Sequence, residues 1–79
     1  MINNIRNFIN DNEFRLTLFD NKVHLINYEE ILSLDTSRVS FQTKTGIIVI
    51  KGENIILNKL LDKEILLKGV INSIEVFNE

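Results

Sequence analysis

Apolar and polar side chains alternate with a period of two from residue 14 onwards. The segment 14–19 reads Phe-Arg-Leu-Thr-Leu-Phe, and the segment 23–26 reads Val-His-Leu-Ile. A period of two is typical of a β-strand, whose successive side chains point to opposite faces of a sheet. Asp20-Asn21, which separates the two segments, tolerates the left-handed backbone of tight turns. The pattern therefore predicts a β-hairpin.

The same alternation, or a run of apolar residues, returns six more times along the chain. These stretches are 31–34, 39–43, 47–50, 55–57, 65–67 and 70–77. We therefore expect seven or eight short strands, spaced about eight to ten residues apart. Strands at this spacing are typical of an antiparallel sandwich, a barrel or a stacked β-roll. The predicted fold class is mainly β, in one small domain.

The N-terminal segment, residues 1–13, has a different pattern. Ile2, Ile5, Phe8 and Ile9 fall at spacings of three and four, which favours one short amphipathic helix. The intervening asparagines are poor helix formers, which favours a tail instead. We expect residues 1–13 to form a short helix or a tail, and residues 14–79 to form the β domain.

Three glycines lie where the chain is expected to turn. Gly46 follows Thr45 in a polar break, and Gly52 and Gly69 each follow a lysine at the end of an apolar stretch. The two Lys-Gly pairs lie seventeen residues apart. Glycine suits a corner where the backbone bends sharply or takes a positive φ. We interpret Gly46, Gly52 and Gly69 as structural corners.

Some of the predicted strands have no polar face. The segments 47–50, 55–57 and 65–67 are apolar in both phases, which indicates strands buried on both sides. A chain of 79 residues has a thin core, so the second face needs a cover. The N-terminal segment, another sheet or another subunit could supply that cover, and we favour a homo-oligomer. The residues proposed for the interaction surface are Phe19, Tyr28, Ile47, Val49 and Ile55.

The composition excludes several classes of site. There is no cysteine and one histidine, so disulfides, thiolate metal sites and histidine-rich metal sites are excluded. The net charge is −2 without a basic block, which does not favour nucleic acid. There is no signal-peptide pattern and no apolar run near the roughly 20 residues that cross a bilayer, so we expect a cytoplasmic protein.

Candidate chemical groups are few, and each has a simpler structural explanation. His24 could act as a base, but no serine or carboxylate is placed by the sequence to form a triad with it. Glu29-Glu30 could act as paired carboxylates, although acidic residues at turns are usually solvated. Lys51 and Lys68 could bind phosphate or only keep the corners soluble. We predict no catalytic residue, no cofactor, no metal site and no small-molecule substrate.

The segments 38–46 (RVSFQTKTG), 48–57 (IVIKGENIIL) and 64–76 (EILLKGVINSIEV) carry a more specific signal. With their two glycine corners at this separation, they resemble the YabP/YqfC family of sporulation proteins. That family has the pattern Ile-x-Gly-x-x-Leu-x-Ile followed by Ile-x-Ile-x-Gly-x-Ile-x-x-Ile. The resemblance covers residues 14–77, and Ile56 stands where the family pattern leads us to expect a leucine.

The resemblance implies a small cytoplasmic protein made during endospore formation, in the mother cell, and linked to assembly of the spore cortex or coat. It also implies a membrane protein of sporulation as a partner, and it supplies no active-site residue. The residues by themselves favour a non-enzymatic assembly protein. The alternative is a small Sm-like or OB-like β-barrel that binds nucleic acid or a ligand, with Phe19 and Tyr28 as exposed aromatic residues.

Overall fold

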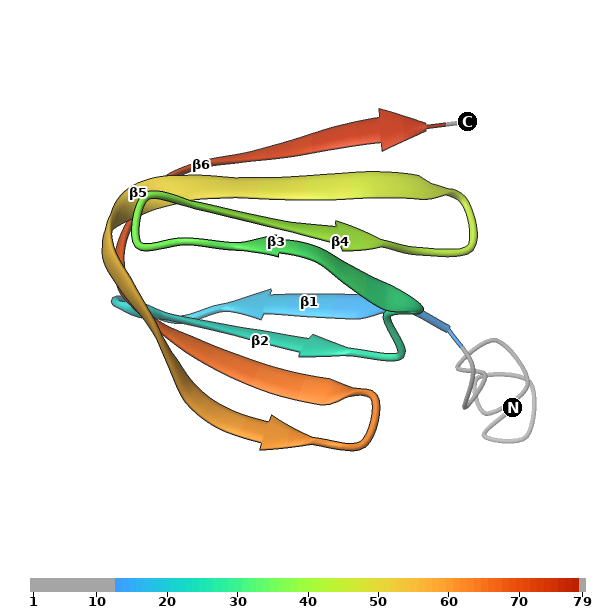
Figure 1. The fold of residues 1–79 in the computed structure, drawn as a ribbon, viewed down its shortest axis with the longest axis horizontal. Coiled ribbons are helices and arrows are strands. Elements are labelled where there is room, and N and C mark those ends of the chain that lie inside the picture. Colours follow the sequence, from blue (N-terminus) through green and yellow to red (C-terminus); the bar gives the residue numbers. More distant parts are fainter. Residues whose placement is uncertain (1–12, 79) are drawn as a thin grey trace, which may run out of the picture.

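The chain folds into one open antiparallel sheet, which confirms the mainly-β prediction (Figure 1). The computed structural model describes residues 13–78, so the predicted N-terminal helix or tail lies outside the described residues, Glu13 apart. The strands are β1 (Arg15–Leu18), β2 (Lys22–Ile26), β3 (Glu30–Leu34), β4 (Arg38–Gln42), β5 (Gly46–Leu61) and β6 (Glu64–Asn78). Their order in the sheet is β1-β2-β6-β5-β4-β3.

The two long strands β5 and β6 belong to both halves of the molecule. The first part of β5 pairs with β4 and with the last part of β6. The last part of β5 pairs with the first part of β6, which also pairs with β2. Both strands curve through the bend at the left of Figure 1, so the sheet folds over on itself. The fold therefore has one half of β3, β4, β5 and β6 and another of β1, β2, β6 and β5.

The Lys-Gly corners bend the strands without ending them. β5 runs for 16 residues through Gly52, and β6 for 15 residues through Gly69. The described part of the chain thus has six strands instead of the expected seven or eight. The register between β5 and β6 shifts at Lys51/Gly52 and again after Glu53, so two irregularities absorb the bend. Bulged strands curve while most of their ladder remains paired.

The glycines at the bend have distinct physical reasons. A Cβ at Gly52 would collide with the carbonyl oxygen of Val70 on β6, so the two backbones approach too closely for any side chain. Gly69 has a φ of 153°, and a Cβ there would lie 2.8 Å from the carbonyl oxygen of Asn54. Asn54 itself has a φ of 55°. Close approach explains Gly52, and backbone conformation contributes at Gly69.

Two hairpin turns accept hydrogen bonds from the backbone at the bend. Gly52 N–H donates to the carbonyl of Ser37 at 3.0 Å, and Ile55 N–H donates to the carbonyl of Thr36 at 2.8 Å. On the other half, Gly69 N–H donates to the carbonyl of Asn21 at 2.9 Å. The turns between β3 and β4 and between β1 and β2 thus satisfy backbone donors that the irregular ladder leaves free.

A single core joins the two halves. Its buried residues are Val23, Leu25, Tyr28, Val39, Phe41, Ile48, Ile50, Ile55, Ile65 and Leu67. Because they come from both halves of the sheet, the halves pack face to face. The Tyr28 and Phe41 rings lie 5.5 Å apart and are tilted by 55°, an arrangement that aromatic pairs favour. The expectation that Tyr28 is exposed was wrong, because its ring fills this core.

Candidate interaction surface

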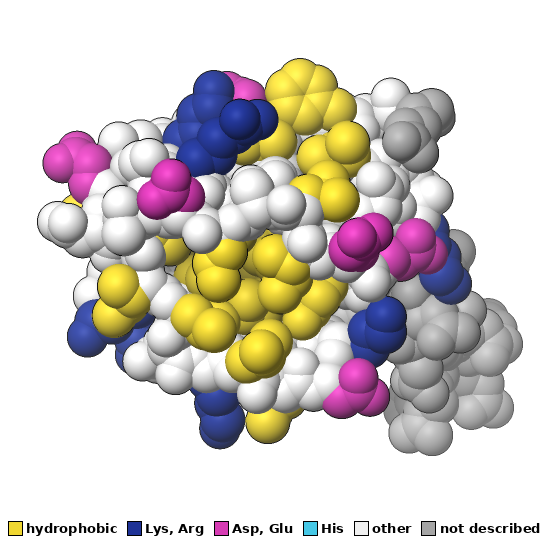
Figure 2. Space-filling view, viewed as in Figure 1, with side chains coloured by type: hydrophobic (Ala, Val, Ile, Leu, Met, Phe, Trp, Pro, Cys, Tyr) yellow, Lys and Arg dark blue, Asp and Glu magenta, His cyan; other side chains and the backbone are white. Residues whose placement is uncertain are grey.

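The most conspicuous surface feature is the amount of exposed apolar side chain. Exposed large apolar residues are Leu18, Phe19, Leu32, Leu34, Ile56, Leu57, Leu60, Leu61, Val70, Val76 and Phe77. Figure 2 shows apolar side chains gathered in the middle of one face, between β4 and the hairpin that joins β5 to β6, and again near the end of β6. Contiguous apolar surface of this kind is typical of interaction sites.

The structure divides the five residues proposed for the interaction surface. Phe19 is 50% exposed at the turn after β1, and Ile47 is half-buried. Tyr28, Val49 and Ile55 are buried within the chain, with exposed fractions of 7%, 2% and 3%. Only Phe19 and part of Ile47 are therefore accessible to a partner of the chain as folded here.

The segments that are apolar in both phases differ in how far their side chains are buried. In the segment 47–50, Val49 is buried although it points away from the core cluster, between Ser40 and Glu75 on the neighbouring strands. In the segment 55–57, Ile55 is buried, but Ile56 and Leu57 are 54% and 39% exposed. The sequence pattern predicted that these residues need a cover, and on the last part of β5 Ile56 and Leu57 remain exposed.

Four stretches of strand lie at an edge of the folded sheet. β1 and β3 are the outer strands. The last part of β5 and the last part of β6 are edges as well, because β4 pairs with β5 only up to Lys51 and β2 pairs with β6 only up to Lys68. Beyond these residues no described strand lies beside them. An edge strand presents unpaired N–H and C=O groups that can pair with another chain.

His24 contacts Glu64 on the outer face of the sheet. Its Nε2 lies 2.6 Å from Glu64 Oε2, and the two side chains are 32% and 40% exposed. With Lys59, Leu61 and Leu66 they line a hollow of about 190 Å³. This is below the roughly 300–1,000 Å³ of ordinary small-molecule pockets. The pair is cross-strand, between β2 and β6, which is a sufficient structural explanation.

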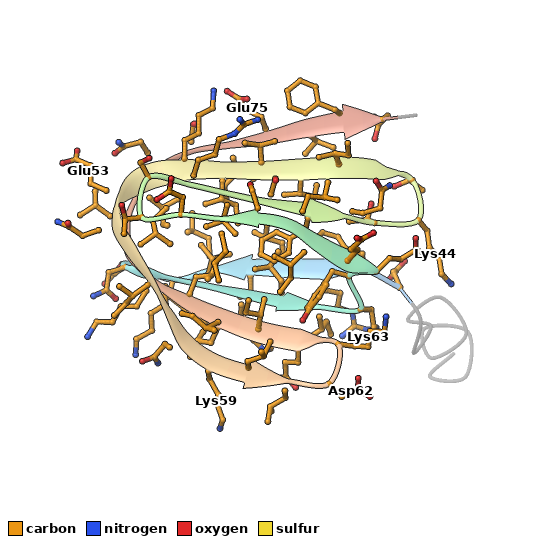
Figure 3. All side chains as sticks on the ribbon, viewed as in Figure 1. Lys44, Glu53, Lys59, Asp62, Lys63 and Glu75 are labelled. Atoms are coloured by element: carbon orange, nitrogen blue, oxygen red, sulfur yellow. The ribbon has the colours of Figure 1, made fainter. Side chains whose placement is uncertain are left out.

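A second hollow lies beside Tyr28, next to the turn that joins β5 to β6. Asn27, Glu29, Lys44 and Lys63 complete its lining, with a volume of about 160 Å³. Figure 3 shows Lys44 and Lys63 at this rim, pointing away from the core. Burial raises the pKa of the Tyr28 hydroxyl above its ordinary value of 10.0, and the carboxylate of Asp62 adds to the rise. Because the lining carries both acidic and basic side chains, it does not indicate one class of ligand.

The remaining candidate groups do not converge. Lys51 pairs with Glu75 of β6 at 3.4 Å, whereas Lys68 lies opposite Lys22 in the other half of the sheet. Glu29 and Glu30 are exposed at the start of β3. Within residues 13–78 no group of three or more histidine, aspartate or glutamate side chains could hold a metal ion. The same part of the chain contains no helix with the length and hydropathy to cross a membrane.

These features define a small all-β protein whose distinguishing surface is apolar and lies along open sheet edges. The YabP family model matches residues 10–79, and the chain belongs to that family. The resemblance noted from the glycine corners is thereby confirmed. Searches of curated proteins and of solved structures gave no match.

Proposed function

We propose that this chain is a non-enzymatic assembly protein of sporulation that acts by binding other protein chains, its own copies first. The observation that carries the proposal is the uncovered apolar surface on open edges, above all the exposed Leu57 and Leu60 on β5 and Val76 and Phe77 on β6. Membership of the YabP family supports the link to sporulation. Self-association would remove this surface from water, which is favourable by roughly 25 cal/mol per Å² buried.

Native mass spectrometry of the purified chain over a range of micromolar concentrations tests the proposal. We expect a discrete oligomer that dissociates on dilution. A strict monomer throughout this range, without binding of a hydrophobic dye, would contradict the proposal. Light scattering on the same samples separates a closed oligomer from open-ended aggregation.

The cellular part of the proposal is cytoplasmic action in the mother cell, with a membrane protein of sporulation as a further partner. A deletion strain of the source organism, if that organism sporulates, should give fewer heat-resistant spores while vegetative growth is normal. Complementation by the intact gene is the control. Unchanged spore yield and resistance would argue against the role in sporulation without touching the oligomer.

The nucleic-acid alternative has lost one of its two aromatic residues. Phe19 is exposed, but Tyr28 is 7% exposed and packs on Phe41. A stacking platform needs accessible rings along a positively charged groove, and the net charge of the chain is −2. Fluorescence anisotropy with labelled oligonucleotides gives a direct test, and salt-sensitive binding at low micromolar protein would favour this alternative.

A further inference from the structure

We infer that the last part of β6 is the self-association edge, and that it pairs antiparallel with the same edge of a second copy about a twofold axis through Val76. The inference rests on the proposed function and names the surface and the partner. It follows from comparing how the open edges are protected, from the direction of the backbone groups on β6, and from the charges along that strand.

Three of the four edges carry features that hinder pairing. β1 is four residues long, and β3 contains a register shift between Ile31 and Ser33. The last part of β5 has two register shifts, and the charged residues Glu53 and Lys59. Short strands, bulges and exposed charges are the common means by which proteins prevent edge-to-edge association.

Within the last part of β6, the stretch Ser73–Asn78 has no register shift and no unpaired charge, because the shift opposite Lys51/Gly52 lies before it, at Asn72. Its register with β5 is regular from Ser73 to Asn78. Its one charged residue in that stretch is Glu75, and the carboxylate of Glu75 is already paired with Lys51 at 3.4 Å. Figure 3 shows Glu75 on the outer side of β6, where the labelled side chain points away from the core. Val76 and Phe77 beside it are 59% and 54% exposed.

The backbone of β6 offers its hydrogen-bonding groups at alternate residues. Thr43 N–H donates to the Gly46 carbonyl at 2.7 Å, so Gly46 directs its groups towards β4. Successive residues of a strand direct their N–H and C=O groups to opposite sides, so Ile47 and its partner Phe77 bond to each other. Val76 then directs its N–H and C=O to the open side. The bond from Gly52 N–H to Ser37 has the same alternation, six residues further along β5.

The charges select one register for the twofold pairing. A twofold axis at Glu75 would place two carboxylates directly opposite each other, and like charges in that position are destabilising. An axis at Ile74 would pair Val76 with Asn72, where the register with β5 is irregular. An axis at Val76 pairs Val76 with its own copy, Ile74 with Asn78 and Glu75 with Phe77. It uses the regular stretch alone, so we place the axis there.

Cysteine cross-linking tests this register directly, because the natural chain has no cysteine. Residues directly opposite in a hydrogen-bonded antiparallel pair have Cα atoms about 5.5 Å apart, within the range that a disulfide spans. Val76→Cys should therefore form a covalent dimer under mild oxidation at protein concentrations where the natural chain is oligomeric. Ile56→Cys is the matched control, since Ile56 is apolar and 54% exposed but lies on β5, and it should cross-link much less.

Substitutions of opposite charge at position 76 provide a second test of the register. Val76→Arg and Val76→Asp should each weaken the dimer at least about tenfold, because like charges then face each other. An equimolar mixture of the two variants should form the heterodimer in native mass spectrometry. Ile56→Arg should dimerise like the natural chain, and circular dichroism checks that every variant is folded.

The outcomes separate this inference from the proposed function. An oligomer that is unaffected by Val76→Arg, or that fails to cross-link through Val76→Cys, would overturn the β6 edge and leave self-association standing through another surface. A natural chain that is monomeric at all concentrations would overturn both. Cross-linking at position 76 together with the heterodimer of the charged variants supports the edge, the partner and the register.

Discussion

Gly52 occupies a point where the backbones of β5 and β6 come too close for a side chain. A Cβ at this position would meet the Val70 carbonyl and could not be accommodated by a side-chain movement. We expect Gly52→Ala to destabilise the domain by about 3 kcal/mol or more, a size associated with overpacking of fixed structure. For a domain of this length that corresponds to a fall in Tm of well over 10 °C, at roughly 4–8 °C per kcal/mol.

Thermal unfolding followed by circular dichroism measures this loss. Glu53→Ala is the control, since the neighbouring side chain is exposed and points outward at the bend in Figure 3. A Tm of Gly52→Ala within 2 °C of that control, about 0.5 kcal/mol, would mean that the two backbones do not approach as closely as described. Gly69→Val should also destabilise, because a φ of 153° disfavours a β-branched residue.

Tyr28 offers a second measurement at a single residue, because the chain has one tyrosine and no tryptophan. Burial and the nearby Asp62 raise its pKa in the folded state, so the folded chain retains the phenol proton to higher pH than the unfolded chain. The stabilisation is complete below the unfolded value near 10 and is lost as pH rises through the folded pKa.

Ultraviolet absorbance of the phenolate gives this titration without interference from other residues. The folded chain should titrate above 10, and the chain in denaturant near 10. Asp62→Asn should lower the folded value, although burial leaves it above the unfolded one. Coincident curves for folded and denatured protein would contradict the burial of Tyr28.

Sequence periodicity predicted the short elements well. The turns at Asp20-Asn21 and around residues 35–37 lie where the polar breaks indicated, and β1 to β4 lie within one or two residues of the expected stretches. It did not predict that β5 and β6 continue through the corners. Glu53-Asn54 has the composition of a turn, and continuity depends on bonds from distant hairpins to Gly52 and Ile55.

The sequence predicted only part of the candidate surface, and the cause is again a local irregularity of the backbone. Counting alternate positions identifies a face only while the strand is regular. Asn27 has a φ of 64°, which changes the direction of the following side chain, and Tyr28 therefore enters the core. The exposed pair Val76 and Phe77 was missed because apolar residues late in a strand resemble core positions. Which part of a strand is an edge follows from the sheet order, which alternation does not contain.

Proline substitutions in β6 test the edge as a structural element. Phe77 directs its N–H to β5, whereas Val76 directs its N–H to the open side. Proline lacks this donor and is tolerated only where the N–H is not needed for the ladder. We expect Phe77→Pro to be less stable than Val76→Pro by about 2 kcal/mol, from the lost and unsatisfied hydrogen bond.

Urea unfolding at a concentration low enough for the chain to be monomeric gives the two free energies. The comparison is matched, since the two residues are adjacent and similarly exposed, at 59% and 54%. Equal losses, or a larger loss for Val76→Pro, would mean that the hydrogen-bonding sides of β6 are reversed. The axis proposed at Val76 would then be wrong as well.

At the scale of the whole molecule, a thin core and an uncovered apolar surface both favour association with a second copy. A domain of this size buries only about 60% of the surface of its unfolded chain, so its stability as a monomer is marginal. Among residues 13–78, eleven large apolar side chains remain exposed. Covering some of them in an oligomer would add to the stability of the folded state, and by mass action that contribution grows with protein concentration.

The Tm should therefore depend on concentration. Between about 1 and 100 μM we expect the Tm of the natural chain to rise by several degrees, since a linked equilibrium gains up to about 2.7 kcal/mol over a hundredfold range. Val76→Arg should show a flat dependence with a Tm near that of the dilute natural chain, whereas Ile56→Arg should retain the slope. Because a change in monomer stability shifts the Tm equally at every concentration, the slope separates an interface residue from a fold residue. A natural chain whose Tm is constant over this range would show that the monomer is stable without a partner copy, and the exposed apolar edge would then have to serve a different protein.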